Sequence, residues 1–577
     1  MSPVFLPLPA KRGEDPPGPS DLKTRTKRER AMRKRPSILS VPILAWALGL
    51  GAACGGGSPA SSGFDARDAS RDLPGVETMD PGGETGDRDV AAADGIIDVA
   101  TDLAAADAPP DIASTCPHGV NVCARDQGCR DDLCGPCVAP KNCRPLQGCL
   151  PDGHCGDCTL DEQCDAGRTC RHGYCIRESL PTWSVTLAPT DFQAILADPY
   201  AIKEVPCQLA VEDKAYADAC TIRVHGGASR DYPKKSFRIE FAQGKDHPGY
   251  SRKLTLRAEY NDASMLRNFL ANEFFRQATD VPAARAHHVW LRINDADYGL
   301  MLLVERVGED FLEGWGRDRT APMYECDPPL DLMRKGSGSF VPLPDEATYE
   351  ATYDKKAGPD GTWADLRSLI EDAVWPDWLE STRLQTTTRR TAPLIAVDRY
   401  LDYLAAMGVL QNHDHVRKNF MLSWQDDGTG PKWEFYPTDL DMTFGCLWDE
   451  AAQDVICDTT VTNEAWDRGV LPDAPAGYPV QAFYNQLIQQ VLRDPALQPR
   501  FQAKICALLD GPFWKDGLPR LIDAMDEALA AAVAKDTRDR AANEAAFHNE
   551  IQELRRFRTE RATFLRTQLG CPGADEP

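Results

Sequence analysis

The chain has no excess of basic residues. Its 577 residues include 64 Lys and Arg against 88 Asp and Glu, a net charge of -24. Nucleic acids and anionic membrane surfaces are polyanions, so this balance argues against both as the main partner. An acidic protein at a surface fits better. With 42% hydrophobic residues, the chain can still bury at least one large core.

Long hydrophobic runs are absent except near the N-terminus. There a basic stretch, "KTRTKRERAMRKRPS", precedes the apolar "ILSVPILAWALGLGAAC", and "GGGSPASSG" follows. The run is too short to span a membrane stably, and the order is that of a secretory signal. We expect residues 1–53 to be an export signal that starts at Met1 or Met32. Cys54 resembles the lipidated cysteine of bacterial lipoproteins; an uncleaved anchor is the alternative.

Aromatic residues are nearly missing from residues 54–114, which are rich in Asp, Ala, Gly and Pro. Such a segment cannot bury enough apolar surface to offset the chain entropy lost on folding. We therefore expect a disordered acidic stalk. Together with a lipid anchor at Cys54, this stalk predicts an exported lipoprotein held at a membrane, in the periplasm or at the cell surface.

Cysteine is concentrated in residues 115–178, which hold twelve of the 20. The spacing recurs with a period of about 21 residues, which marks an internal repeat. Downstream of an export signal, an even number of cysteines predicts a disulfide framework, and zinc at the two C-x-x-C steps is the weaker alternative. Two further candidate bridges are Cys207 with Cys220 and Cys446 with Cys457.

Residues 180–570 have the composition of a mixed globular domain, and residues 571–577 form a short tail. Alternating segments such as "TWSVTLA", "SFRIEFA", "HHVWLRIN" and "GLMLLVERV" predict strands. Periodic segments such as "VDRYLDYLAAMGVLQN" and "ANEAAFHNEIQELRRFRTERATFLRTQL" predict helices. Strands dominate the first part and helices the second, so we expect an α+β domain.

Two charged residues fall on predicted apolar faces. Alternation along "KKSFRIEF" places Lys235 on the apolar side, where an ammonium needs an anion; an edge lysine is the common alternative. In "NDASMLRNFLANEFFRQA", Asn261 or Asp262 is expected to cap a helix whose apolar stripe includes Glu273. A carboxylate there requires a partner unless it reaches solvent from the margin of the stripe. Lys235 and Glu273 are therefore a candidate pair.

Oxygen-rich side chains flank a predicted hairpin. Asp414 and Asn419 precede the strand "FMLSW", "QDDGTG" is the turn, and Asp439 and Asp441 follow the return strand "KWEFYP". Antiparallel pairing brings the two ends together. Three carboxylates and an amide then converge, a ligand set suited to Mg²⁺ or Mn²⁺.

Five blocks occur in the order found in one known family: "GGASRDYPKKSFRIEF", "LRAEYNDASMLRNFLANEFFR", "WLRINDADYGLMLLVERV", "NHDHVRKNFML" and "YPTDLDMTFG". They resemble the spore coat protein H (CotH) kinases over roughly residues 185–570. The resemblance implies an atypical protein-kinase-like, two-lobed domain that phosphorylates proteins with ATP and a divalent metal ion.

On this sequence, the resemblance implies Asp414 as the catalytic aspartate and Lys235 as the residue on the nucleotide phosphates. It implies Asn419 and Asp439 as metal ligands, with Asp441 as a second carboxylate ligand.

No full Gly-x-Gly-x-x-Gly loop precedes the lysine. We therefore expect the nucleotide phosphates to be contacted by "HGGASR", with Ser229 and Arg230, and by Lys234. Glu305, in "LVERV", falls where the hinge beside the nucleotide is expected. Glu273 as the partner of the lysine is an inference from helical phase.

Three functions are open. The first is a kinase that acts on Ser or Thr of envelope proteins, although ATP is scarce outside the cytoplasm. The second is a non-catalytic surface protein on a kinase-like fold. The third, a metal-dependent hydrolase, leaves Lys235 and Glu273 unexplained. The converging carboxylates favour an enzyme, because an inert scaffold has no need of them.

Overall fold

The computed structural model describes most of the chain from Val120 onward. The ranges are 120–216, 219–242, 251–328, 339–359, 361–377, 390–412, 414–416, 418–426, 428, 430–449, 454–457, 485–537 and 544–571. The predicted export signal, Cys54 and the acidic stalk lie outside them. Within these ranges, no helix has the length and apolar character needed to cross a membrane.

The Cys-rich segment folds as short repeats, each with a 3₁₀ turn and a two-stranded hairpin. Its elements are η1 (Val120–Val122), β1 (Gly128–Arg130), β2 (Leu133–Gly135), η2 (Pro140–Asn142), β3 (Gly148–Cys149), β4 (Cys155–Gly156), η3 (Asp161–Gln163), β5 (Arg168–Arg171) and β6 (Tyr174–Arg177). Their disulfides are Cys123–Cys134, Cys137–Cys149, Cys143–Cys155, Cys158–Cys170 and Cys164–Cys175. In the second and third repeats, the first cysteine bonds the third and the second bonds the fourth.

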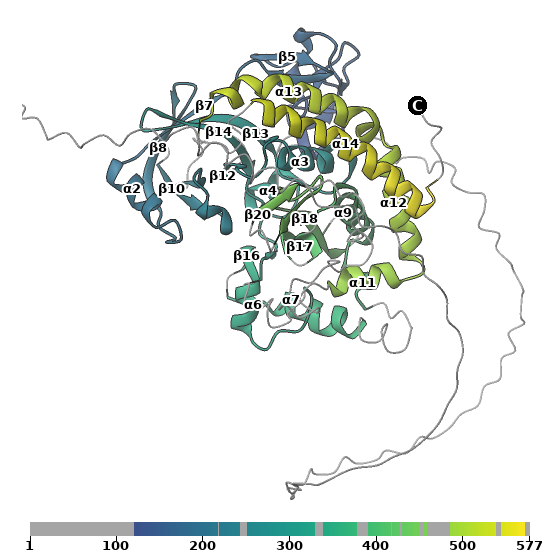
Figure 1. Cartoon of the computed structure of the whole chain (residues 1–577). Coiled ribbons are helices and arrows are strands. Elements are labelled where there is room, and N and C mark those ends of the chain that lie inside the picture. Colours follow the sequence, from purple (N-terminus) through teal and green to yellow (C-terminus); the bar gives the residue numbers. More distant parts are fainter. Residues whose placement is uncertain are drawn as a thin grey trace, which may run out of the picture. The chain divides into compact units, whose positions relative to one another are not determined.

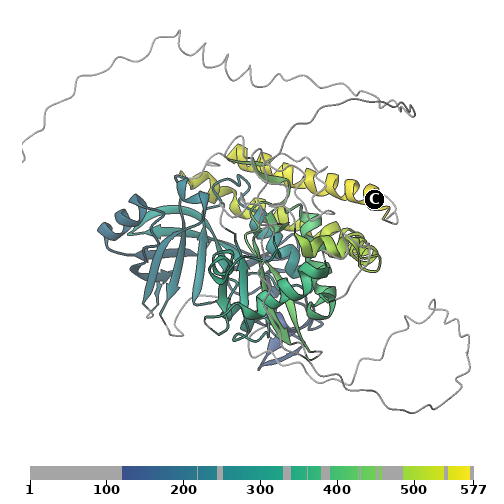
Figure 2. The same cartoon turned by 90° about the horizontal axis from the view of Figure 1, so that it is seen from below.

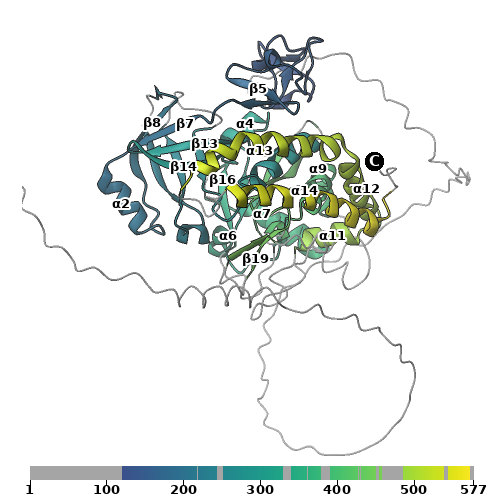
Figure 3. The same cartoon turned by 45° about the horizontal axis from the view of Figure 1, so that its top comes forward.

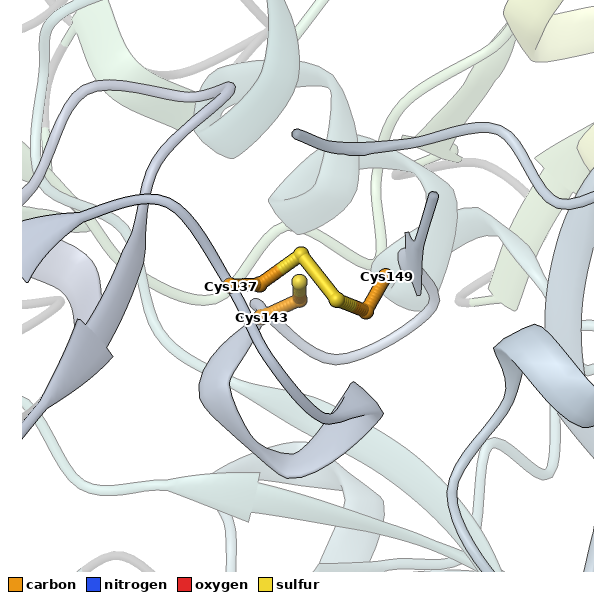
Figure 4. Close-up of side chains that lie close together, drawn as sticks. All are labelled: Cys137, Cys143 and Cys149. Carbon is orange, nitrogen blue, oxygen red and sulfur yellow. A yellow bond between two sulfur atoms is a disulfide. The ribbon is translucent and has the colours of Figure 1, made fainter. Parts of the chain in front are cut away.

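The predicted disulfide framework is thus confirmed. Cys137, Cys143 and Cys149 lie close enough for their sulfurs to hold a metal ion, but Cys137 and Cys149 are bonded to each other (Figure 4). Cys143 is bonded to Cys155. A disulfide sulfur is no thiolate, so the zinc alternative has no ligands in this cluster.

A buried amide explains why the 3₁₀ turns of the second and third repeats close. The Asn142 side-chain oxygen accepts the backbone N–H groups of Val138 (3.3 Å) and Ala139 (3.0 Å). Gln163, which lies one repeat later, accepts the N–H groups of Thr159 (2.6 Å) and Leu160 (3.1 Å). These side chains satisfy backbone donors at the start of η2 and η3, where no preceding turn supplies an acceptor.

A closed seven-stranded barrel forms the first half of the main domain (Figures 1 and 2). Its order is β10–β11–β12–β14–β13–β7–β8, with β8 pairing back to β10 and β9 added beside β8. All pairs are antiparallel except β13 with β7. The strands are β7 (Thr182–Thr186), β8 (Val205–Val211), β9 (Lys214–Ala215), β10 (Cys220–His225), β11 (Ser236–Phe241), β12 (Lys253–Arg257), β13 (Ala286–Ile293) and β14 (Ala296–Glu305).

The predicted Cys207–Cys220 bridge joins β8 to β10 where the barrel closes. Strand β14 is buried on both faces, which explains its unbroken apolar run. Met301 and Leu303 belong to the core of the barrel, whereas Leu300 and Leu302 belong to the larger core outside it. The barrel wall is therefore part of both cores.

The second half is helical around a four-stranded sheet of order β16–β15–β17–β18. The strands are β15 (Met323–Cys326), β16 (Tyr353–Ala357), β17 (Phe420–Asp426) and β18 (Pro431–Pro437), and a separate hairpin pairs β19 (Cys446–Asp449) with β20 (Asp454–Cys457). The predicted Cys446–Cys457 bridge links that hairpin. The α+β expectation is confirmed, and the strands of the first half close into a barrel. The two-lobed kinase-like arrangement stays a prediction.

Helices cover the sheet and the outside of the barrel. They are α2 (Pro189–Ala197), η4 (Ala228–Asp231), α3 (Arg267–Ala278), α4 (Glu309–Gly314), α6 (Glu346–Thr352), α7 (Ala364–Ser368), η5 (Leu369–Val374), η6 (Ala392–Leu394), α9 (Val397–Leu410), η7 (Asp414–Val416), α11 (Gln486–Arg493), α12 (Leu497–Asp510), η9 (Phe513–Gly517), α13 (Leu518–Lys535) and α14 (Glu544–Leu569). Helices α13 and α14 run side by side (Figure 3). The predicted helices correspond to α9 and α14.

Candidate active site

The predicted hairpin is present, and its two ends meet as expected. Strand β17 pairs antiparallel with β18 so that Phe420 lies opposite Pro437. Asn419 therefore enters the hairpin beside the point where the chain leaves it toward Asp439. Both residues have positive φ, +57° for Asn419 and +53° for Asp439. Asn and Asp tolerate this conformation better than other side chains, because they hydrogen-bond locally.

An amide bridges two carboxylates at this junction. The Asn419 Nδ2 group donates to Asp414 Oδ2 at 3.0 Å and to Asp439 Oδ2 at 3.5 Å. Lys418 Nζ lies 3.6 Å from the same Asp414 oxygen. Asp414 is only 3% exposed and Asn419 only 6%. The structure thus brings together three of the side chains that the sequence predicted to converge.

Arg257, at the end of β12, was not anticipated. Its guanidinium donates to Asp439 Oδ1, and its Nη1 lies 3.8 Å from Asp441 Oδ2. Burial works against the charged form, but Asp439 and Asp441 outweigh it and raise the pKa of Arg257. The sequence feature that could have indicated Arg257 is its charge at the end of "KLTLR". Arg257 is also the second residue of the block "LRAEYNDASMLRNFLANEFFR".

The carboxylates around Arg257 repel one another. Glu259 is 8% exposed and accepts a hydrogen bond from Asn268 Nδ2 at 3.1 Å. Burial raises the pKa of Glu259 to about 7. Burial also raises the pKa of Asp441 well above its usual range, and the charges of Asp439 and Glu259 raise it further. A divalent cation bound here would relieve this repulsion.

The donor set fits Mg²⁺ or Mn²⁺. Asn419 uses its Nδ2 group on the two aspartates, and no contact of the described residues occupies its Oδ1. Together with the carboxylates of Asp439 and Asp441, it offers hard oxygen ligands, which these ions prefer. Binding of the metal ion would require the Arg257 guanidinium to share the carboxylates of Asp439 and Asp441 with the ion or to move away from them.

A pocket of about 60 Å³ adjoins this cluster. Its wall includes Ser229 and Lys234 from the turn before β11, and Arg257, Glu259 and Asp441 from the carboxylate cluster. Two residues predicted to cover nucleotide phosphates therefore face the same space as a predicted metal ligand.

The expected position of Lys235 on the apolar face needs a correction, whereas its role on the nucleotide phosphates stays a prediction. Strand β11 begins only at Ser236, so the alternation that buries Phe237 does not extend back to Lys235. The Lys235 ammonium instead donates to the carbonyl oxygen of Arg230, and Tyr298 binds its backbone. Burial lowers the pKa of Lys235.

Lys234 is the buried lysine, at 1% exposure. Its ammonium donates to the carbonyl oxygen of Leu300 (2.5 Å) and to Asp536 Oδ2 (2.8 Å). The sequence pattern thus correctly required an anion for a buried ammonium, but assigned the requirement to the neighbouring residue.

The candidate pair of Lys235 and Glu273 is not formed. Glu273 is buried on α3 as predicted, but its partners are Arg276, whose Nε lies 3.3 Å away, and Gln277, which donates at 3.0 Å. Helical phase correctly required a partner, and residues three and four positions further along the same helix supply it. The capping expectation for Asn261 or Asp262 was wrong, because α3 begins later and its N-cap is Leu266; Asp262 still accepts the backbone N–H of Arg267 at 2.8 Å.

The side chains of Glu305 and Arg230 have other contacts. Arg285 forms a two-point contact with the Glu305 carboxylate, with its Nη2 at 2.6 Å and its Nε at 3.0 Å. A nucleotide contact by Glu305 would therefore use its backbone and stays a prediction. The Arg230 guanidinium lies 5.4 Å from the centre of the Tyr200 ring. Its phosphate role also stays a prediction.

Comparison with known proteins gives two matches. The family model described as "CotH kinase protein" matches residues 222–565, which is more than half of the chain. The inner spore coat protein H of Bacillus subtilis (strain 168) is 26% identical over 269 residues, which cover 47% of this chain and 70% of that protein. The matched range contains the hairpin, Arg257 and the pocket residues.

Proposed function

Because this chain belongs to the CotH kinase protein family, we propose that it is a metal- and ATP-dependent phosphotransferase, an atypical protein kinase. The observation that carries the proposal is the Asn419 amide between the Asp414 and Asp439 carboxylates. A catalytic aspartate beside an asparagine and an aspartate that hold metal ions is the set with which kinases position phosphoryl groups.

Each side chain then has a role. Asp414 accepts the hydrogen bond of a Ser or Thr hydroxyl and takes its proton, while the Asn419 amide orients that carboxylate. Mg²⁺ or Mn²⁺, when bound by Asn419, Asp439 and Asp441, would neutralise charge on the phosphate oxygens. Arg257 adds positive charge beside the same pocket, which is lined by Ser229 and Lys234.

The acceptors are expected to be surface or envelope proteins. The relative is named as a spore coat protein, which is a protein of a surface layer. Numerous disulfides fit an oxidising compartment. We therefore propose an exported protein, anchored through Cys54 in the periplasm or at the cell surface. It would use nucleotide released nearby or another phosphate donor.

The test measures transfer of labelled γ-phosphate from ATP, with Mg²⁺ or Mn²⁺, by the full chain to itself and to a Ser/Thr-rich acceptor. We expect Asp414→Ala and Asp439→Asn to lower the rate by at least about 100-fold. Asp426→Asn is the matched control, because Asp426 lies at the other end of the same hairpin, where it accepts the N–H groups of Gly428 and Gly430 in the turn. It should keep the wild-type rate.

One observation favours the non-catalytic alternative. Arg257 already contacts Asp439 and Asp441, so one cation of the chain itself compensates part of their charge without a metal ion. If the wild-type chain transfers no label, and neither ATP nor Mn²⁺ raises its melting temperature, the fold serves as a displayed binding module. Label that persists in both aspartate variants would also contradict the kinase proposal.

A further inference from the structure

A second cavity, of about 880 Å³, lies where the Cys-rich repeats meet the main domain. Residues of the candidate active site do not contribute to its wall. From the repeats, the lining residues are Asn121, Val122, Cys123, Ala124, Arg125 and Arg144. From the domain, Arg276, Trp315 and Arg317 stand out. Four arginines thus border one cavity in a chain whose net charge is -24.

In the described part of the chain, no carboxylate forms an ion pair with Arg144. Its hydrogen bonds go to backbone carbonyl oxygens, at 2.8 Å for Cys123 and at 3.4 Å for both Asn121 and Arg276. Among the ranges that the structure describes, no carboxylate lies within ion-pair distance of it. Burial and the nearby charges of Arg276 and Arg125 lower the pKa of Arg144 to about 10.

Arg276 leaves a donor unused. It is 4% exposed, and its Nη2 donates to the Asn121 side-chain oxygen at 3.4 Å. Its buried Nη1 has no hydrogen-bond partner in the described part of the chain, and the same holds for the indole N–H of Trp315. Each unpaired buried donor costs about 1–3 kcal/mol, so two in one wall require an explanation.

The acids nearby do not remove the excess charge. Glu273 lies 3.3 Å from Arg276, Glu434 lies 2.9 Å from Arg317, and exposed Asp280 lies 3.4 Å from exposed Arg125. These three carboxylates pair with three of the four guanidiniums, and Glu434 is shared with Arg399. The positive charge of Arg144 is left without a paired carboxylate among the described residues, and it favours an anionic ligand.

From these contacts we propose that the cavity binds an acidic peptide segment of another protein, with its carboxylates on Arg144, Arg276 and Arg125. The planar guanidinium matches a carboxylate with two parallel hydrogen bonds. The volume is at the upper end of ligand sites and far exceeds one carboxylate, so several side chains fit. Trp315 and Val122 offer apolar surface for their methylene groups.

The test follows a fluorescein-labelled hexaglutamate peptide by anisotropy with the full chain at low salt, in EDTA and without ATP. We expect hexaglutamate to bind, hexaglutamine to bind at least about tenfold more weakly, and added salt to weaken the hexaglutamate complex. Arg125→Gln with Arg144→Gln should lower the affinity by at least about tenfold. Arg130→Gln is the control, because Arg130 is exposed, lies outside the wall of the cavity and pairs with Asp131 at 3.7 Å.

Equal melting temperatures of the variants and the wild type show that the fold is intact. Three results would overturn the proposal: equal binding of hexaglutamine, unchanged affinity in the double variant, or citrate binding more tightly than the peptide. The last would mean that the site takes a free small anion. Because ATP and metal ions are left out, the result does not depend on phosphotransfer.

Discussion

The buried charge of Lys234 is compensated by a partner that is remote in the sequence. The ammonium of Lys234 reaches Asp536, which follows α13, at 2.8 Å. The same Asp536 oxygen accepts the backbone N–H of Leu300 at 2.7 Å. One carboxylate thus joins the turn before β11, strand β14 and the end of α13.

Asp536→Asn tests this connection. The variant leaves the Lys234 ammonium buried beside a neutral amide, so we expect the free energy of unfolding to fall by about 3–5 kcal/mol in urea denaturation. Lys535→Gln is the matched control, because Lys535 forms an exposed pair with Asp297 at 3.2 Å. Its loss should not exceed about 1 kcal/mol. Equal losses in the two variants would contradict a structural role for the buried pair.

Glu259 predicts a pH dependence of stability. Its pKa rises from 4.5 to about 7 in the folded state, chiefly because the carboxyl is buried. Between these values the folded protein keeps a proton that the unfolded chain has released, so stability falls as pH rises through this window. Above it, the ionised carboxylate costs the folded state about 3 kcal/mol; below it, the effect vanishes.

In EDTA, Glu259→Gln should therefore be more stable than the wild type at about pH 8 and equal to it at about pH 4. The Gln side chain keeps an oxygen that can accept from Asn268. Urea unfolding of both proteins across this range measures the difference. A constant difference at all pH values would mean that Glu259 does not titrate in this window.

At the scale of elements, disulfides reinforce segments that hydrogen bonds already join. Cys506–Cys571 links α12 to the residue beyond α14 and closes a loop with a sequence separation of 65. Cys207–Cys220 closes a much shorter loop, with a separation of 13, across paired strands. A longer closed loop restricts the unfolded chain more.

Serine replacement of each pair gives a direct comparison. Loss of Cys506–Cys571 should lower the free energy of unfolding by about 4 kcal/mol, and loss of Cys207–Cys220 by about 3 kcal/mol. The variant without Cys506–Cys571 should therefore have the lower midpoint of urea unfolding. The reverse order would mean that local packing at the barrel seam, and not loop closure, determines the contribution of each bridge.

At the scale of the whole described structure, the last Cys repeat is part of the main core. Tyr174 is 3% exposed, and its hydroxyl donates to the carbonyl oxygen of Gly517 at 3.0 Å. Ile176 is also buried in the large core. Arg520 of α13 donates to the carbonyl oxygen of His172 at 2.9 Å. The repeat therefore covers an apolar face of α13.

We expect a chain that starts at residue 180 to melt at a lower temperature than one that starts at residue 157. The shorter chain exposes the surface that Tyr174 and Ile176 cover, and loss of a buried aromatic residue alone costs about 3–5 kcal/mol. The longer chain keeps the third repeat with both of its disulfides. Equal melting temperatures would show that the domain does not need this repeat.

Local patterns predicted the elements well. Turn residues and alternation located the β17–β18 hairpin, and the apolar period located α9 and α14. Alternation failed at Lys235 because it applies only inside a strand, and β11 begins one residue later. The role of Arg257 was not predictable from spacing, because its partner Asp439 lies 182 residues away.

The sequence by itself determined the repeat, its disulfide character, the α+β composition and the convergence of Asp414, Asn419 and Asp439. These features depend on residues that are close together in the sequence or that are joined by one hairpin. Only the tertiary structure decided that the strands close into a barrel, that Asp536 compensates Lys234 and that Arg257 compensates the carboxylate cluster. Such contacts join distant segments, and a buried charge requires a partner without specifying which one.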